Sequence, residues 1–548
     1  MSFEEKTISN LDETVQNVTD SSTSSLPGQN DKLSKFLNYS VNKHQEVDKK
    51  YADETYDLIQ SNGGEVGELT PEKEKKLFRK LLYTVLPIVF IVNATLFIDK
   101  DAISYTSLLG GFKDMHLTKQ KYNNIQTYFY VGYLVGQIPS HLLFQKLPIS
   151  KYITLATACW SLISFCTLAS HSYAGMSVLR FFLGIVESGI TPCVEHTIAM
   201  FFTIEEQAFV NPIFWISCLG IDVPTVFIAY GLQFATKWRP WKWYWLFVGI
   251  ISAIVSIFCY FFYPDNPATS VLFTTEEKIH IIKRIKAQTK SSIEQKVFKK
   301  YQFIECIKDP ISWLFFLFCI MNMLENSTTY QASIIYTSLG FTNLTSTLLM
   351  VVQNGFSTFC GLCGAAALYY FKKQSCLVGA CFMIPAFAGA ILAVSISYEN
   401  KAGLLAGIFM TRTNGTAYIM ALSLCQATAA GYTKRLTRTV MFMIAYGIGN
   451  IISPQMWQAK YSPRYRVPWI IQIIFAWFLS PLVLLLIRYI LNKRNKIRLE
   501  ILEKGENDDL DYGYIDSVNE EGKVVSKKVD VSMLDLTDLE NIRFIYPL

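Results

Sequence analysis

Two residues of opposite charge interrupt a long apolar run, and their spacing is typical of anion binding and proton transfer. The run AGMSVLRFFLGIVESGITPCVEHTIAMFF covers residues 174–202 and contains Arg180 and Glu187. Residues seven apart on an α-helix are two turns apart, so both side chains lie on one face, with Gly184 between them. A guanidinium binds carboxylates, and a carboxyl group kept away from water can exchange its proton near neutral pH. The alternative is an internal salt bridge that only orients helices.

Three further titratable residues stand in apolar surroundings. A charge near the bilayer centre costs at least ~2.5–3.5 kcal/mol, so each is a functional candidate. Asp99 and Lys100 interrupt the run that ends in FIDKDAISYTS. Either the helix ends there and Lys100 reaches the outer interface, or the helix continues and Asp99 faces a cavity. His196 either relays a proton or hydrogen-bonds a neighbouring helix.

Polar residues in the second half of the chain form another group of candidates. Each either lines a substrate cavity or ties two helices together. The candidates for substrate binding are Asn322, Gln353, Asn354, Arg412 and Asn414, and Glu325 is a further inward-facing candidate. Asp222, in the span near 210–233, is a similar candidate in the first half of the chain.

These residues must be positioned by membrane-spanning helices. The chain has 548 residues, of which 51% are hydrophobic and only 17% are charged. An average soluble protein has about 25% charged residues. So few charges cannot cover a soluble protein of this size, and disorder, collagen and coiled coil are excluded as well. The net charge of +6 does not indicate nucleic-acid binding.

Twelve apolar runs of roughly 20 residues each are long enough to cross a bilayer. They lie near 81–105, 122–145, 152–170, 174–202, 210–233, 242–263, 311–331, 345–368, 376–397, 402–426, 436–459 and 467–491. The order of six spans, a polar segment and six spans predicts an all-α membrane protein of two six-helix bundles that rock about a central site.

The charge distribution predicts the orientation of the spans. With both termini cytoplasmic, inner segments hold 25 Lys and Arg and outer segments hold 11, as the positive-inside rule requires. The expected parts are a disordered acidic tail (1–76), an N-terminal bundle (77–263), a cytoplasmic central loop (264–310), a C-terminal bundle (311–491) and an acidic cytoplasmic tail (492–548). Within the loop, residues 274–289 predict an amphipathic helix, either on the inner membrane surface or as a solvated linker.

Seven ordered motifs resemble the fungal allantoate permease group, in the anion:cation symporter branch of the major facilitator superfamily. They are FIDK (97–100), YVGYLVGQIPS (130–140), LRFFLGIVESGITPC (179–193), YPDNPATSVLFTTEEK (263–278), AAGYTKR (429–435), GIGNIISPQ (447–455) and DLTDLENIRF (535–544). The resemblance implies the major facilitator fold and uptake of a small organic anion with protons. It also implies that Asp99, Lys100, Arg180 and Glu187 bind the substrate carboxylate and couple the proton.

The resulting hypothesis is a proton-coupled importer. Lys100 and Arg180 would bind the anion, and Asp99, Glu187 and His196 would carry the proton. No enzymatic activity and no cofactor other than the proton gradient are expected. The expected partners are the anion, the proton and the lipid bilayer, without nucleic acid, and the chain is expected to be a monomer. The expected location is the plasma membrane, with the endoplasmic reticulum or vacuole as alternatives. Other possibilities are transport of a thiamine-related or sulfur-containing compound, and a transporter-like nutrient sensor.

Overall fold

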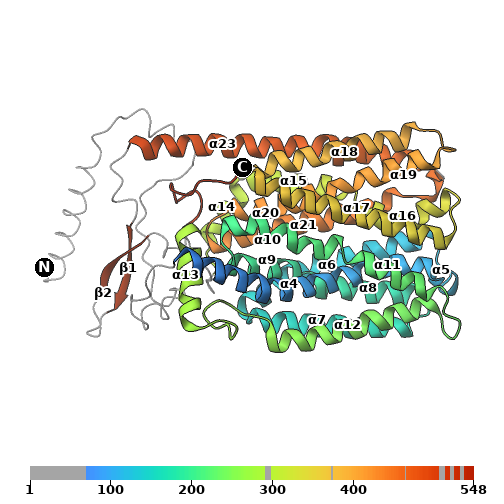
Figure 1. The fold of residues 1–548 in the computed structure, drawn as a ribbon, viewed down its shortest axis with the longest axis horizontal. Coiled ribbons are helices and arrows are strands. Elements are labelled where there is room, and N and C mark those ends of the chain that lie inside the picture. The colour runs from blue at the N-terminus through green and yellow to red at the C-terminus, as the bar shows by residue number, and fades with distance from the viewer. Residues whose placement is uncertain are drawn as a thin grey trace, which may run out of the picture.

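The computed structural model describes residues 70–289, 298–371, 374–462, 464–504, 512–518, 524–530 and 536–548. Most of the expected N-terminal tail, residues 1–69, lies outside the described residues. The described chain forms two groups of helices that lie side by side, one coloured blue to green and one yellow to red (Figure 1).

The first group comprises the helices that precede the central segment. They are α4 (Pro71–Leu108), α5 (Gly111–Asp114), α6 (Lys119–Lys146), α7 (Ile149–Ala169), α8 (Tyr173–Glu187), α9 (Ile190–Phe201), α10 (Ile204–Leu219), α11 (Asp222–Leu232) and α12 (Pro240–Phe262). Local sequence explains their starts. Pro71 opens α4, with Glu72 and Glu74 in its first turn, where the helix dipole favours negative charge. Thr203 and Glu206 form a capping box that opens α10.

The second group follows two short helices, α13 (Thr275–Thr289) and α14 (Lys300–Lys308). Its members are α15 (Pro310–Met323), α16 (Ser327–Ser338), α17 (Asn343–Tyr370), α18 (Ser375–Ser395), α19 (Lys401–Met410), α20 (Asn414–Ala427), α21 (Tyr432–Met456), α22 (Arg466–Gln472) and α23 (Ser480–Lys504). A π-helical segment, η4 (Ile473–Leu479), joins α22 to α23, and two short 3₁₀ segments are η2 (Thr411–Thr413) and η3 (Ala459–Tyr461).

Within the described residues, nine helical segments are long and apolar enough to cross a membrane. The predicted span near 122–145 corresponds to α6, which is not among the nine. The other two predicted spans that are not among the nine are interrupted. The span near 311–331 divides into α15 and α16, and the span near 402–426 divides into α19, η2 and α20. Glu325 and Arg412 lie at these interruptions, where they pair with each other.

The central helix α13 packs against protein, which corrects both sequence-based interpretations of residues 274–289. Ile281, Ile282 and Ile285 of α13 are buried in the same apolar core as residues of α9 and α10. Its polar side is also fixed, because Arg284 pairs with Glu206 at 2.7 Å and Glu277 with Lys80 at 2.6 Å. The helix therefore neither lies on a membrane through its apolar face nor stands as a solvated linker.

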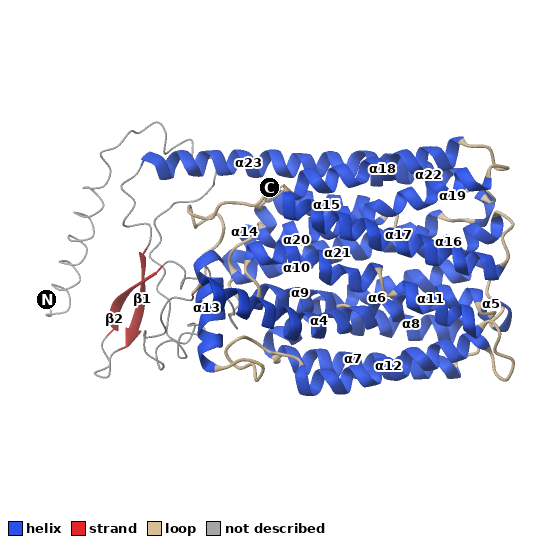
Figure 2. Cartoon of the chain, viewed as in Figure 1, coloured by secondary structure: helices blue, strands red, loops and turns tan. Residues whose placement is uncertain are grey.

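The acidic C-terminal tail contains structure that the all-helical prediction did not include. Strands β1 (Tyr512–Val518) and β2 (Val524–Asp530) pair in antiparallel fashion, with Tyr512 opposite Asp530. This hairpin lies beyond the end of the helical groups from which α13 and α14 project (Figure 2). The last described segment, 536–548, returns to the C-terminal helices and buries Asp538 and Tyr546.

A buried charge cluster holds this segment in place. Lys434 Nζ on α21 lies 2.7 Å from Asp538 Oδ1 and 2.7 Å from Glu305 Oε1 of α14. Asp309, which caps α15, forms salt bridges with Arg438 at 2.7 Å and with Arg494 at 2.8 Å. The Tyr546 hydroxyl donates to Asp538 Oδ2 at 2.7 Å. The end of the chain thereby links α14, α15, α21 and α23.

Candidate substrate and proton site

Three consecutive charged residues, Asp99, Lys100 and Asp101, lie in the interior of α4 and are only 0%, 4% and 8% exposed. Because α4 continues to Leu108, Lys100 is not at a helix end, so the alternative of an outer-interface lysine is wrong. Consecutive residues on a helix point about 100° apart. The three side chains therefore reach three different neighbours, and sequence reasoning had singled out only the first two.

Lys100 lies among aromatic rings. Its Nζ is 5.1 Å from the ring centre of Phe97, 6.0 Å from Phe129, 5.6 Å from Tyr133 and 5.3 Å from Tyr446. The negative faces of such rings attract an ammonium group. In the part of the chain that the structure describes, no carboxylate lies within ion-pair distance of Lys100. Its positive charge is thus stabilised without being neutralised.

Arg180 is held in a similar way by α4 and α12. Its guanidinium carbon is 4.9 Å from the Trp245 ring centre and 5.9 Å from that of Phe129. One terminal nitrogen donates to the Asp99 backbone carbonyl at 3.5 Å, and Nε has no partner. Arg180 and Glu187 share the buried face of α8. They form no salt bridge among the described contacts, and both Glu187 carboxyl oxygens are buried without a hydrogen-bond partner.

Close contact between α6 and α8 sets the position of this face. A Cβ on Gly184 would lie 2.0 Å from the Phe129 carbonyl oxygen, and one on Gly132 would lie 2.0 Å from that of Phe181. The space beside Gly184 is therefore filled by a neighbouring helix and not by a ligand. The α8 helix ends at Glu187, and Ser188 and Gly189 separate it from α9.

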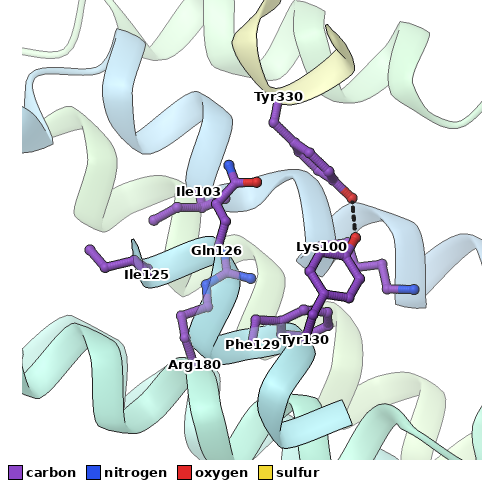
Figure 3. Close-up of a pocket in the computed structure, with 8 residues that line it drawn as sticks. All are labelled: Lys100, Ile103, Ile125, Gln126, Phe129, Tyr130, Arg180 and Tyr330. Atoms are coloured by element: carbon purple, nitrogen blue, oxygen red, sulfur yellow. Dashed lines mark hydrogen bonds between the residues drawn. The ribbon is translucent and has the colours of Figure 1, made fainter. Parts of the chain in front are cut away.

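A small cavity of about 10 Å³ is lined by both cations. Its lining residues, from α4, α6, α8 and α16, are Lys100, Ile103, Ile125, Gln126, Phe129, Tyr130, Arg180 and Tyr330 (Figure 3). Tyr130 and Tyr330 face each other from the two helical groups, and their hydroxyls are 2.9 Å apart (Figure 3). Sequence reasoning did not find Gln126, Tyr130 or Tyr330, because uncharged residues do not stand out in an apolar run.

Asp99 and Asp101 are not among the residues that line this cavity. The Ser164 hydroxyl of α7 donates to Asp99 Oδ2 at 3.4 Å, and Asp99 Oδ1 has no partner. Asp101 is buried on α4, and Asp222, the first residue of α11, is buried as well.

The candidates in the C-terminal group are tied to one another. Arg412 pairs with Glu325 at 3.7 Å and donates to Thr329 at 2.6 Å. Asn414 Nδ2 donates to Glu325 Oε1 at 3.2 Å, and Asn322 Nδ2 donates to Asn414 Oδ1 at 3.1 Å. None of these residues lines the cavity. In this structure they join α15 and α16 to η2 and α20.

The remaining two candidates in this group also lie away from the cavity. Gln353 accepts a hydrogen bond from the Tyr336 hydroxyl, and Asn354 is buried on the same helix, α17. Of the residues predicted to bind substrate, the cavity lining contains Lys100 and Arg180.

His196 lies in a separate hollow between the two groups. Its ring centre is 5.7 Å from that of Tyr432, and Nε2 has no hydrogen-bond partner. The hollow, about 20 Å³, shares no lining residue with the cavity at Lys100. The neighbouring Glu195 accepts a hydrogen bond from Trp215 Nε1 at 2.9 Å. Within the described ranges, no three His, Cys, Asp or Glu side chains converge as metal ligands would.

Polar contacts join the two groups where α6 begins and α21 ends. Gln120 donates to Gln455 at 3.0 Å, and Gln455 donates to Thr127 at 2.8 Å. Asn123 donates to the Trp457 carbonyl at 3.2 Å and accepts from Gln331 at 2.8 Å. The cavity is therefore closed on this side by the approach of the two groups.

Comparison with known proteins identifies the family. Residues 79–454, more than half of the chain, match the sequence model of the Major Facilitator Superfamily. The chain belongs to the Major Facilitator Superfamily. The chain is also similar to a solved proton:xylose symporter of this superfamily, with a TM-score of 0.55, 13% identity, and coverage of 73% of this chain and 96% of that one. The predicted fold class, the major facilitator fold, is confirmed.

Relatives within the superfamily are named transporters. The chain is 44% identical to an uncharacterized transporter of Schizosaccharomyces pombe, over 92% of this chain and 89% of the relative. It is 41% identical to a high affinity cysteine transporter of Saccharomyces cerevisiae, over 92% and 96% of the two chains. The allantoate permease of the same yeast is 27% identical over 88% of each. The protein is thus a multi-pass membrane transporter and not an enzyme. Its similarity to the allantoate permease is weaker than its similarity to the cysteine transporter.

Proposed function

We propose that this superfamily member imports a small sulfur-containing amino acid, with cysteine as the first candidate, together with protons. The 41% identity to a high affinity cysteine transporter, over nearly the full length of both chains, supports this substrate class. An amino acid carries a carboxylate, so the expectation of anion recognition at Lys100 and Arg180 is retained. The sulfur-containing alternative is preferred to a small organic anion without sulfur.

One observation carries the proposal. Lys100 and Arg180 face the same cavity, are nearly inaccessible to solvent, and form no ion pair among the described contacts. A buried charge without an opposite charge nearby is costly. Here two positive side chains, Lys100 and Arg180, are both removed from water, which increases the cost. A carboxylate that enters the cavity neutralises part of this positive charge. The anion therefore binds beside two cations that form no ion pair with a protein carboxylate among the described contacts.

In this structure the cavity, about 10 Å³, has room for about one water molecule. Substrate binding therefore requires movement of the two helical groups about the cavity. Aromatic and apolar side chains, Phe129 and Ile103 among them, make up much of the lining.

Proton coupling is assigned to carboxyl groups beside the cations. Asp99 and Glu187 are fully buried, and three of their four carboxyl oxygens have no hydrogen-bond partner. An ionised carboxylate without partners is costly in such surroundings. Proton binding from outside, substrate binding, movement of the two groups about the cavity, and release inside complete an alternating-access cycle.

The test is uptake of radiolabelled cysteine into cells that lack their own transporters for sulfur amino acids. Wild-type protein should accumulate label, more so at acidic external pH, and a protonophore should abolish the accumulation. Lys100→Gln and Arg180→Gln should each reduce uptake at least tenfold. Lys460→Gln is the matched control, because Lys460 is exposed but also lies over an aromatic ring, 4.9 Å from the Tyr461 centre.

Competition experiments separate the substrate classes. Unlabelled cysteine should block uptake, whereas 3-mercaptopropionate, which lacks the amino group, tests whether the carboxylate and thiol are sufficient. If allantoate or nicotinate competes and cysteine does not, the organic-anion class without sulfur is correct. If no tested compound crosses the membrane, the nutrient-sensor alternative is favoured and the proposal is wrong.

A further inference from the structure

An open groove lies at the end of the C-terminal group opposite α13 and α14 (Figure 1), which is the outer end in the expected orientation. Its volume is about 530 Å³, whereas the cavity at Lys100 and the hollow at His196 measure about 10 Å³ and 20 Å³. A single water molecule needs roughly 10–15 Å³, so the groove has room for a much larger group. Its lining residues are Tyr398, Tyr461, Ser462, Arg464, Arg466 and Val467.

Arg464 is held in a fixed position beside the groove. One terminal nitrogen donates to the Ile396 carbonyl oxygen at 2.8 Å, and the guanidinium carbon is 5.8 Å from the ring centre of Tyr398. The Tyr398 hydroxyl in turn donates to the Ser338 carbonyl oxygen at 2.5 Å. A guanidinium carries five N–H donors in a planar fork, so this single hydrogen bond leaves most of them for a ligand.

Tyr465, between the two arginines of the lining, anchors the segment that carries them. Its side chain is buried, its hydroxyl accepts a hydrogen bond from Lys119 of α6, and Lys119 Nζ is 3.9 Å from its ring centre. Arg466 is the first residue of α22 and is exposed. Among the described contacts, neither Arg464 nor Arg466 forms an ion pair with a carboxylate. Two positive charges therefore border the groove without an opposite charge from the protein.

An apolar stripe begins at the groove and continues along the last membrane span. Val467 lines the groove and is exposed, and Ile470, Ile474 and Phe478 are exposed as well. Intervals of three and four residues place these side chains along one side of α22 and η4. Figure 2 shows α22 beside α18 at the edge of the C-terminal group, away from the N-terminal group. This side of the span is therefore open to lipid acyl chains.

We propose that the groove binds the phosphate group of an anionic phospholipid, whose acyl chains lie along the stripe that begins at Val467. Arginine forks match phosphate oxygens in geometry and charge. Two arginines without a protein carboxylate favour a head group of net negative charge over a zwitterionic one. A dissolved anion would meet the arginines but would leave the apolar stripe without a partner. The site is separate from the substrate cavity, because no residue lines both.

The test compares lipids on the purified full-length protein in a neutral detergent. Phosphatidylglycerol should raise the Tm, because a ligand that binds only the folded state stabilises it, and the concentration needed for a given rise scales with Kd. Phosphatidylcholine with the same acyl chains should need at least fivefold more lipid for the same rise. The double variant Arg464→Gln/Arg466→Gln should need at least tenfold more phosphatidylglycerol than wild type.

Two single variants complete the test. Lys460→Gln is the matched control and should respond as wild type, because Lys460 is exposed in the same segment but does not line the groove. Arg466→Gln covers the case in which the double variant does not fold. Arg466 makes no hydrogen bond or ion pair among the described contacts, so the Tm of this variant without lipid should equal the wild-type value. It should nevertheless need at least threefold more phosphatidylglycerol.

Several results would overturn the proposal. One is a wild-type response of Arg466→Gln and of the double variant to phosphatidylglycerol. An equal loss in Lys460→Gln would attribute binding to general surface charge and not to the groove. Equal potency of phosphatidylcholine would contradict the preference for an anionic head group, and the same Tm rise with inorganic phosphate would assign the groove to a dissolved anion. None of these measurements involves transport, so their outcome does not depend on the proposed substrate.

Discussion

The C-terminal segment supplies a carboxylate to a lysine that has no contact with solvent, so loss of that charge should destabilise the C-terminal helices. Lys434 and Asp538 are both 0% exposed, and their charged atoms are 2.7 Å apart. Asp538 also accepts the hydroxyl of Tyr546 at 2.7 Å. The substitution Asp538→Asn keeps the shape of the side chain and removes the charge.

The magnitude follows from what remains around Lys434. Breaking a buried ion pair by removal of one partner costs about 3–5 kcal/mol, because the other charge stays buried. Lys434 still has Glu305 at 2.7 Å and Asp309 at 3.8 Å, so we expect the lower end, about 3 kcal/mol. One kcal/mol shifts Tm by ~2–4 °C in a unit of 150–250 residues, so the expected decrease in Tm is roughly 6–12 °C.

The assay is thermal unfolding of the purified full-length protein in detergent. Glu500→Gln is the matched control, because Glu500 is an exposed carboxyl group on α23. A double-mutant cycle with Lys434→Met should yield a favourable coupling energy of about 1–3 kcal/mol between the two side chains. A Tm for Asp538→Asn within ~2 °C of the wild-type value corresponds to a loss of stability of less than about 1 kcal/mol. That result would refute the reasoning.

Three other expectations concern packing, the C-terminal polar cluster and pH. Gly184→Ala should reduce expression and uptake, because its Cβ would meet the Phe129 carbonyl oxygen at 2.0 Å, whereas Gly355→Ala, with open space around it, should match wild type in both assays. Glu325→Gln should lower thermal stability by about 3 kcal/mol, since Arg412 loses its buried partner; an unchanged Tm would contradict a structural role for that pair. Burial alone would raise the pKa of Asp538, but Lys434 and Arg438 outweigh it and hold the pKa below the ordinary 3.8. The stabilisation by Asp538 is therefore complete above pH 3.8 and decreases as the pH falls below that value. The Tm difference between wild type and Asp538→Asn should narrow only in that acidic range. Thermal unfolding curves at a series of pH values measure this difference.

Helical periodicity explains why part of the site was predictable. The spacing of Arg180 and Glu187 places both on one face, and the buried face of α8 contains both. The GxxxG pattern of Gly132 and Gly136 predicts close packing, and a Cβ at either position would meet the backbone of α8 at 2.6 Å or less. Apolar runs of the required length likewise predict nine of the twelve expected spans, and the other three lie at helices that are shorter or less apolar.

Partners from other helices were not predictable in the same way. The sequence left open whether Arg180 pairs with Glu187, and whether Arg412 and Asn414 line a cavity or tie helices. The structure places Arg180 over Trp245 and joins Arg412 to Glu325. The partner of each arginine depends on how α8 and the segment η2 are rotated relative to the neighbouring helices. Local spacing in the sequence does not determine that rotation.

By itself the sequence determined a membrane transporter architecture and the residues whose charges are costly in an apolar setting. Both follow from composition and from the fixed geometry of a single helix. Only the tertiary structure decided where those charges point. Asp99 and Lys100 are consecutive, yet one meets Ser164 and the other a ring of aromatic side chains, because a helix turns 100° at each residue and each direction faces a different neighbour. The contact of Asp538 with Lys434 could not be predicted from the sequence either, because it joins two segments 104 residues apart in the chain.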